Sequence, residues 1–354
     1  MQITIMNHAS RISLALLMGV GLFTTMTAHG QDDAALNEAM VNPGYHDKPV
    51  WFKESFLDIK EDIEEAASNG KRLLLYFYQD GCPYCAKLLQ DNFGQRNIAN
   101  KTQNYFDVIA INMWGDREIT WIDGNTATEK SIALRMRVMF TPTMLFLDEK
   151  GGVALRVNGY YAPDKFEAVL DFVGRRMERK MAFSDYYQKQ SPTKASGKLH
   201  PQKFILKQTD LTKVMSKNDK PLLVLFDQKQ CAGCDELHTD IFTRKETLEQ
   251  LKRFNVVRFD MWSTTKLVTP TGRPLTARDW AKRLKIQYAP TMVMFDQTGK
   301  EIIRTEAYFK SFHVQSVMDY AASGAYKEQP SFQRFISKRA EKLEAQGVHI
   351  DLME

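Results

Sequence analysis

The chain contains one segment twice, and each copy carries two cysteines separated by two residues. All four cysteines of the chain belong to these pairs: Cys82 and Cys85, then Cys231 and Cys234. A largely apolar segment precedes each pair, at residues 71–77 and 220–226; the copies match here at an offset of 149 residues, and further blocks match at an offset of 148. A repeat of this length predicts two domains side by side, because the units of a solenoid have a much shorter period.

Length and composition are compatible with two globular domains. The chain has 354 residues, of which 44% are hydrophobic and 26% are charged, with a formal net charge of +5. These values argue against a disordered chain, a collagen-like chain and a polytopic membrane protein. The charge is too mild, and the basic residues too scattered, for an electrostatic nucleic-acid binder.

The N-terminal residues have the pattern of a secretory signal peptide. Arg11 precedes an apolar run at residues 12–23, and small residues follow at Ala28 and Gly30. The run is shorter than the about 20 apolar residues of a membrane span, which disfavours the alternative of an uncleaved anchor. We therefore expect a signal peptide at residues 1–30, cleavage near Gly30 and export to the periplasm.

Changes in composition predict where the other segments begin and end. Residues 188–201 are polar and contain Pro, Ser, Gly and Lys without an apolar period, as expected of a linker. We expect, in chain order, an N-terminal arm, a first domain, a linker, a second domain and a C-terminal helix or tail: residues 31–50, 51–187, 188–203, 204–337 and 338–354.

The periodicity of apolar residues predicts an α/β fold for each domain. In the first copy we expect helices at residues 51–68, from Cys82 onward, at 128–137 and 163–176, and strands at 73–78, 106–113, 143–147 and 153–157. Alternating strands and helices favour a parallel core, and the final hairpin adds antiparallel strands. The expected architecture is a mixed central sheet flanked by helices, repeated in the second copy.

Each cysteine pair lies between a predicted buried strand and a predicted helix. At a helix N-terminus the dipole and the free N–H groups favour a thiolate, which is the attacking species in disulfide exchange. The second cysteine, one turn further on, is close enough to close a disulfide. We therefore expect Cys82 and Cys231 to be nucleophiles exposed at the helix start, and Cys85 and Cys234 to be the resolving thiols.

Three other roles for the cysteine pairs have weaker support. A structural disulfide across two residues closes a very short loop and stabilises little by chain entropy. The two pairs are too far apart in sequence for a compact zinc ribbon. A copper site could use His238 near Cys234, although such a histidine is more often a helix-surface residue. No phosphate-binding loop or His/carboxylate cluster is evident, so we expect no nucleotide or metal cofactor beyond the redox disulfides.

The sequence resembles the thioredoxin superfamily in both copies. The strand–Cys-x-x-Cys–helix segments carry the resemblance, together with two segments before the predicted hairpins, Thr141-Pro142-Thr143 and Ala289-Pro290-Thr291. The resemblance implies tandem thioredoxin-like domains in which both prolines are cis and shape a substrate groove. The residue before each proline, Thr141 or Ala289, would offer its backbone to an extended substrate peptide.

The first copy also resembles the SoxW-like periplasmic thioredoxins. The matching stretches are Ile111–Thr120, Asp123-Gly124 and Tyr160-Tyr161, of which the second copy keeps only Met261-Trp262 and a Pro-containing loop. We therefore interpret the second copy as diverged. The resemblance implies an exported enzyme acting on protein thiols and disulfides, with electrons from a membrane thiol reductant of the DsbD or CcdA kind.

Both copies depart from ordinary thioredoxins near the cysteines. Tyr76 and Leu225 stand where those proteins have a buried Asp that accepts the proton of the resolving Cys, so the general base is left unnamed. Tyr84 completes a Pro-Tyr dipeptide like that of glutaredoxins and is a candidate substrate contact.

Several side chains near the pairs have two interpretations. Lys229 is placed to stabilise the Cys231 thiolate and Asp80 to act against the Cys82 thiolate, but both are more often plain solvated residues. Trp114 and Trp262 end predicted strands, where they either pack in the core or form part of a substrate loop.

Three functions fit these patterns. The leading hypothesis is an exported thiol–disulfide oxidoreductase that reduces protein disulfides through a mixed disulfide at both sites. The second is a disulfide oxidase or isomerase, because two sites in one chain resemble the protein disulfide isomerase layout. The third is a non-catalytic polypeptide-binding or chaperone module. The direction of electron flow stays open, since potentials on similar architectures run from about −270 to about −120 mV.

Overall fold

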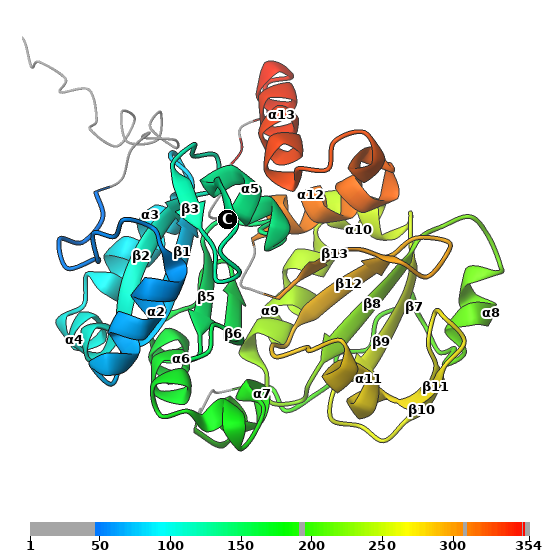
Figure 1. Ribbon diagram of the computed structural model, residues 1–354. Helices are drawn as coiled ribbons and strands as arrows, with labels where there is room; N and C mark the ends of the chain where they lie inside the picture. The colour runs from blue at the N-terminus through cyan, green and yellow to red at the C-terminus, as the bar shows by residue number, and fades with distance from the viewer. Residues whose placement is uncertain (1–46, 191–194, 307–309, 349, 351–354) are drawn as a thin grey trace, which may run out of the picture. The chain divides into compact units, whose positions relative to one another are not determined.

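A computed structural model describes residues 47–190, 195–306, 310–348 and 350 (Figure 1). The expected signal peptide, and all of the expected arm except its last four residues, lie outside these ranges. The described chain forms two bodies, each with a mixed central sheet and flanking helices. The expected α/β class is therefore confirmed. No helix within the described ranges is long and apolar enough to cross a membrane.

The sheet of the first domain has the strand order β2-β1-β5-β6. β1 is parallel to β2 and antiparallel to β5, and β5 is antiparallel to β6. The strand bounds are Arg72–Tyr78 (β1), Phe106–Asn112 (β2), Thr143–Leu147 (β5) and Val153–Asn158 (β6). Both faces of β1 and β5 are covered, which is why these strands read as continuous apolar runs.

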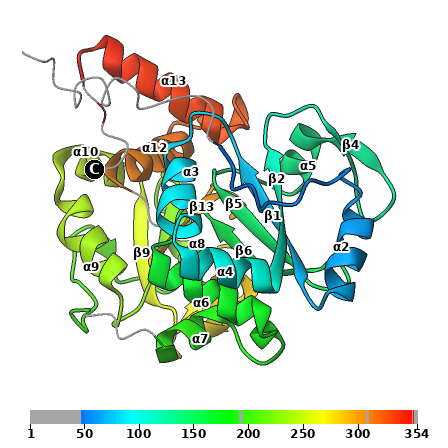
Figure 2. The ribbon, with the colours of Figure 1, turned by 90° about the vertical axis from the view of Figure 1, so that its left-hand side faces the viewer.

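Helices cover both faces of this sheet (Figure 2). Alternate residues of β1 point to opposite faces. Leu74 and Tyr76 pack with residues of α4 and α6, whereas Leu73 and Leu75 pack with residues of α2 and α5. The helices are α2 (Ile59–Ser68), α3 (Pro83–Lys87), a π-helical turn (Leu88–Phe93), α4 (Arg96–Tyr105), α5 (Glu129–Arg135), α6 (Pro163–Gly174), a 3-10 turn (Met177–Arg179) and α7 (Phe183–Gln190).

The first helix begins later than the periodicity predicts. It starts at Ile59 instead of residue 51, because the Asp58 side chain caps it and accepts hydrogen bonds from two backbone N–H groups. Leu57 has a φ of +65°, which ends the preceding segment. That segment is not helical: the Phe52 N–H donates to the carbonyl oxygen of Pro49 over 2.9 Å, and the Lys53 N–H donates to the carbonyl oxygen of Val108 over 2.8 Å.

The sequence patterns do not predict four elements of the first domain. Most residues of α4 are polar, so its buried stripe gives a weak signal. The hairpin of β3 (Glu118–Thr120) and β4 (Thr126–Thr128) is too short to show a period. α7 packs Phe183 against Phe172 and continues to Gln190, so the first three residues of the expected linker are helical.

The second domain repeats the arrangement with an added strand. Its sheet has the order β13-β12-β8-β9-β7, in which β7 is parallel to β9. The strands are β7 (Ile205–Leu206), β8 (Leu222–Asp227), β9 (Asn255–Asp260), β12 (Thr291–Phe295) and β13 (Glu301–Thr305), with a separate hairpin of β10 (Lys266–Val268) and β11 (Pro274–Thr276).

The helices are α8 (Leu211–Met215), α9 (Ala232–Thr239), α10 (Lys245–Leu251), α11 (Ala277–Arg283), α12 (Ser311–Ala322) and α13 (Phe332–Ala345), with 3-10 turns at Ile241–Thr243 and Ala325–Lys327. α13 therefore begins before the expected tail at residue 338.

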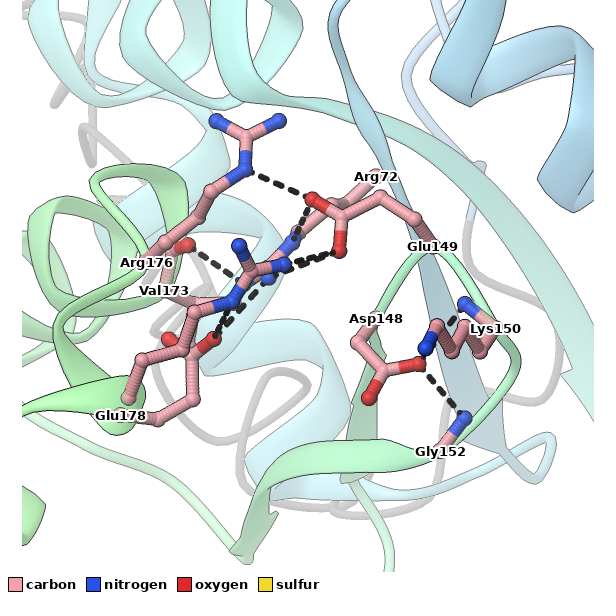
Figure 3. Close-up of polar contacts among 9 residues, drawn as sticks. Arg72, Asp148, Glu149, Lys150, Gly152, Val173, Arg176 and Glu178 are labelled. Carbon is pink, nitrogen blue, oxygen red and sulfur yellow. Dashed lines mark hydrogen bonds and ion pairs between the residues drawn. The ribbon is translucent and has the colours of Figure 1, made fainter.

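A buried arginine connects β1 to the β5–β6 turn and to the end of α6 through hydrogen bonds and ion pairs (Figure 3). Arg72, at the start of β1, is 2% exposed and donates to the carbonyl oxygen of Val173 over 2.8 Å. Its guanidinium also pairs with Glu178 at 2.9 Å and with Glu149, in the β5–β6 turn, at 3.1 Å. The hydrogen bond from Arg72, with a further one from Arg176, lowers the pKa of Glu149 to about 2. The network anchors β1 to that turn and to the end of α6.

Candidate active sites

The first cysteine pair lies at the start of α3 and is oxidised. Cys82 is the N-cap residue, and its Sγ accepts the backbone N–H of Cys85, its disulfide partner, over 3.1 Å. Pro83 suits the first helical position, where its missing N–H leaves no intrahelical bond unmade. Gly81 has a φ of +69°, which allows the sharp turn from β1 into the helix.

The second pair repeats this geometry at the start of α9. Cys231 is the N-cap residue, and its Sγ accepts the backbone N–H of Cys234 over 2.9 Å in an oxidised pair. In both domains the second cysteine is buried, at 1% exposure for Cys85 and 2% for Cys234. A backbone N–H that points at the first sulfur would favour its thiolate once the disulfide is reduced.

A loop with a cis proline lies against each pair. The Thr141–Pro142 and Ala289–Pro290 bonds are cis, as expected. In the first domain, Cys82 Sγ lies 3.4 Å from the carbonyl oxygen of Thr141. In the second, a Cβ atom added to Gly233 would lie 3.2 Å from Pro290 Cδ, so the first turn of α9 approaches that proline closely. The structure thus brings the expected loop residues to the cysteines.

The expected exposure of the nucleophiles is wrong for this oxidised form. Cys82 is 3% and Cys231 is 6% exposed. The first pair packs in an apolar cluster with Phe140 and with Tyr84, which is itself buried. In the second domain, Ala289 is half-buried and lines a cavity together with Cys231.

Equivalent tryptophans donate hydrogen bonds to glutamines that precede each cysteine pair. Trp114 Nε1 donates to Gln79 Oε1 over 2.7 Å, and Trp262 Nε1 donates to Gln228 Oε1 over 2.8 Å. Each glutamine lies three residues before the first cysteine, and both tryptophans are half-buried. The tryptophans therefore combine packing with a polar contact beside the site.

The two charged residues near the pairs are exposed. Asp80 lies two residues before Cys82, and Lys229 lies two residues before Cys231. They are on the turns that lead into α3 and α9. Their exposure agrees with the interpretation as solvated side chains.

Sequence reasoning missed a buried Asp–His pair in the second domain. Asp227 ends β8 and His238 lies on α9; each is 1% exposed, and His238 Nε2 lies 2.8 Å from Asp227 Oδ2. The interpretation of His238 as a helix-surface residue is therefore wrong. The signal was an Asp at the end of an apolar strand and a His four residues after Cys234. Within the described ranges, no three or more His, Cys, Asp or Glu side chains are grouped to hold a metal ion.

Comparison with protein families identifies the same type of domain in both halves of the chain. The family model for the thioredoxin-like domain matches residues 59–174 and 208–322. A thioredoxin-fold protein from Helicobacter pylori is 22% identical over 38% of this chain and 91% of its own, with a TM-score of 0.31. The DsbD C-terminal domain of Neisseria meningitidis is 16% identical over 32% of this chain and 90% of its own, with a TM-score of 0.24.

A longer match is a protein disulfide oxidoreductase from Aeropyrum pernix K1, 12% identical over 79% of this chain and 97% of its own, with a TM-score of 0.24. The comparison with curated proteins gave no match. The two family matches together cover more than half of the chain. The chain therefore belongs to the thioredoxin-like domain family and carries two such domains in tandem.

Proposed function

We propose that this protein is an exported thiol–disulfide oxidoreductase that reduces protein disulfides at two sites. One observation carries the proposal: in both domains, the first cysteine caps a helix and its Sγ accepts a backbone N–H beside a cis-proline loop. The thioredoxin-like domains and the two Cys-x-x-Cys motifs support thiol–disulfide chemistry. The N-terminal pattern and the SoxW-like resemblance support export and a periplasmic location.

The first step is attack by the thiolate of Cys82 or Cys231 on a substrate disulfide. A new S–S bond forms between protein and substrate, the substrate S–S bond breaks, and one substrate sulfur leaves as a thiolate that takes a proton from solvent. The helix N-terminus and the N–H of the fourth residue stabilise the attacking thiolate. Thr141 or Ala289 would hold the substrate backbone beside the sulfur.

The second step releases the substrate. The thiolate of Cys85 or Cys234 attacks the first cysteine, the mixed disulfide breaks, and the second substrate sulfur leaves as a thiol. The substrate has gained two electrons and the protein pair is oxidised. A dithiol reductant must return those electrons, and we propose a membrane thiol carrier of the DsbD or CcdA kind for that role. No other cofactor enters these steps.

Serine variants of the two nucleophiles test the proposal. We expect Cys82→Ser and Cys231→Ser each to lower the rate of insulin-disulfide reduction by dithiothreitol, and the double variant to abolish the catalysed rate, since no thiolate is left to attack. Refolding of scrambled ribonuclease measures isomerase activity on the same samples. A double variant as active as the unmodified chain would show that the cysteines are incidental, as in a polypeptide-binding module.

A further inference from the structure

The buried Asp227–His238 pair belongs to the second domain, and the two disulfide-exchange steps described above do not use it. Asp227 is the last residue of β8, four residues before Cys231, and His238 lies on α9, four residues after Cys234. Residues four apart in a helix share a face, so His238 is on the same face as the buried Cys234. The pair therefore lies on the two elements that position the second cysteine pair.

The hydrogen bonding of this pair is incomplete. His238 Nε2 and Asp227 Oδ2 lie 2.8 Å apart. Among the residues that the structure describes, neither His238 Nδ1 nor Asp227 Oδ1 has a hydrogen-bond partner. Because an ionised carboxylate only accepts, the Nε2 atom is assigned the ring proton, and Nδ1 is left as an acceptor. A carboxylate that orients a histidine in this way leaves the other ring nitrogen able to take a proton.

The neighbouring titratable groups already have partners. The His200 ring stacks on His238 at 5.6 Å and bonds Asp235 at 2.6 Å. Burial opposes ionisation of Asp235, but hydrogen bonds from His200 and Ser196 lower its pKa overall. On β9, the Asp260 carboxylate accepts the N–H of Trp262, and the Arg258 guanidinium donates to the carbonyl oxygen of His200. Within the described ranges, these groups therefore do not supply a hydrogen bond to His238 Nδ1.

The first domain has no equivalent pair. Tyr78 and Leu89 occupy the corresponding positions, and Tyr78 ends the β1–β2 ladder as Asp227 ends the β8–β9 ladder. Tyr76 lies deeper in β1, and its hydroxyl has no partner among the described residues. Burial raises the pKa of Tyr76 further above its ordinary value of 10.0, so it stays protonated at neutral pH and cannot act as a base.

We propose that Asp227 and His238 are the buried proton acceptor of the second site and take the Sγ–H proton of Cys234 in the resolving step. A buried thiol attacks only after it loses its proton. His238 Nδ1 takes that proton, Cys234 Sγ bonds to Cys231 Sγ, and the mixed disulfide breaks. The substrate sulfur leaves with the electron pair of that bond, and it is protonated by the imidazolium or by solvent. The proposal rests on the proposed function.

A probe disulfide separates the two steps in the full-length chain. With Cys82→Ser and Cys85→Ser in place, only the second site reacts. One equivalent of 5,5′-dithiobis(2-nitrobenzoate) is mixed with the reduced chain, and release of coloured thiolate is followed by stopped flow from about pH 5 to about pH 9. Attack by Cys231 releases the first thiolate, and attack by Cys234 releases the second.

We expect Asp227→Asn and His238→Gln to slow the second phase about tenfold or more at pH 7, and to leave the first phase unchanged. The second phase of the unmodified second site should also show a pH inflection that both variants lose. Asp240→Asn is the matched control, because Asp240 follows α9, its side chain is 47% exposed and it pairs with Arg244. It should change neither phase.

Two results would overturn the proposal in distinguishable ways. If the first phase is normal and both variants keep the rate and pH profile of the second phase, the pair is purely structural. If Cys231 does not react at all, the proposed function of this site fails, and the proton acceptor with it. Should the variants not fold, the unmodified sites are compared instead: the first site, isolated by Cys231→Ser and Cys234→Ser, has no such pair, and its second phase must follow a different pH profile. Identical profiles at the two sites would contradict the proposal.

Discussion

At the scale of single residues, burial decides which charges matter for the fold. Arg72 directly precedes the apolar residues of β1, and the sequence alone does not reveal that it is 2% exposed. Its partners come from a turn and from the residues after α6, so tertiary packing brings them together. The same holds for Asp227 and His238, which meet only because β8 and α9 pack on each other. Such pairs cannot be read from a local pattern.

Glu149→Gln should lower the free energy of unfolding by about 2 kcal/mol at pH 7, because Arg72 loses a charged partner. The folded-state pKa of Glu149, about 2, is below its ordinary value of 4.5. Its stabilisation is therefore present above about pH 4.5 and is lost as the pH falls toward 2. Denaturant unfolding across this range should show a shallower loss of stability in the variant. The control Glu64→Gln removes an exposed pair with Lys60 and should have little effect; equal effects of both variants would contradict this account.

At the scale of elements, strands were easier to predict than helix ends. β1 and β8 are buried along their length and read as apolar runs. The start of α2 was misplaced because Phe52 and Phe56 imitate helical spacing. In the structure Phe52 packs edge-on against Phe93, whereas Phe56 is fully exposed. A segment without helix can thus show a helical period by chance, and the cap at Asp58 is the better signal.

Asp58→Ala should destabilise the chain by about 1 kcal/mol, because the N–H groups of Lys60 and Glu61 lose their acceptor. Asp210→Ala should do the same at α8, where Asp210 accepts from Thr212 and Lys213. Denaturant unfolding measures both effects. Asp58→Asn is the control, since asparagine caps as well as aspartate. Alanine and asparagine variants of equal stability would show that the cap is not the cause.

At the scale of the whole molecule, the two domains share one arrangement of strands and helices around their cysteine pairs. They differ in other residues of the strand and the helix that position those pairs. The repeat and the Cys-x-x-Cys positions followed from short motifs in the sequence, and the cis prolines followed from the resemblance to the thioredoxin superfamily. The added strand β7 and the Asp227–His238 pair distinguish the second domain. The pairing of β7 with β9 joins segments distant in sequence, and the contact of Asp227 with His238 depends on how β8 and α9 pack, so the motifs of the repeat did not reveal either difference. The second copy has therefore diverged in the surroundings of its cysteines and kept their geometry.

The most direct test of the central claim, that both cysteine pairs are redox-active, is the reduction potential of each pair. The full-length chain is equilibrated in dithiothreitol buffers of stepped potential and quenched in acid. Free thiols are then labelled with a mass tag and mapped by peptide. We predict a two-electron transition for each pair at a potential above about −300 mV. A pair that stays a disulfide well below that potential would be structural, and the proposed function would fail at that site.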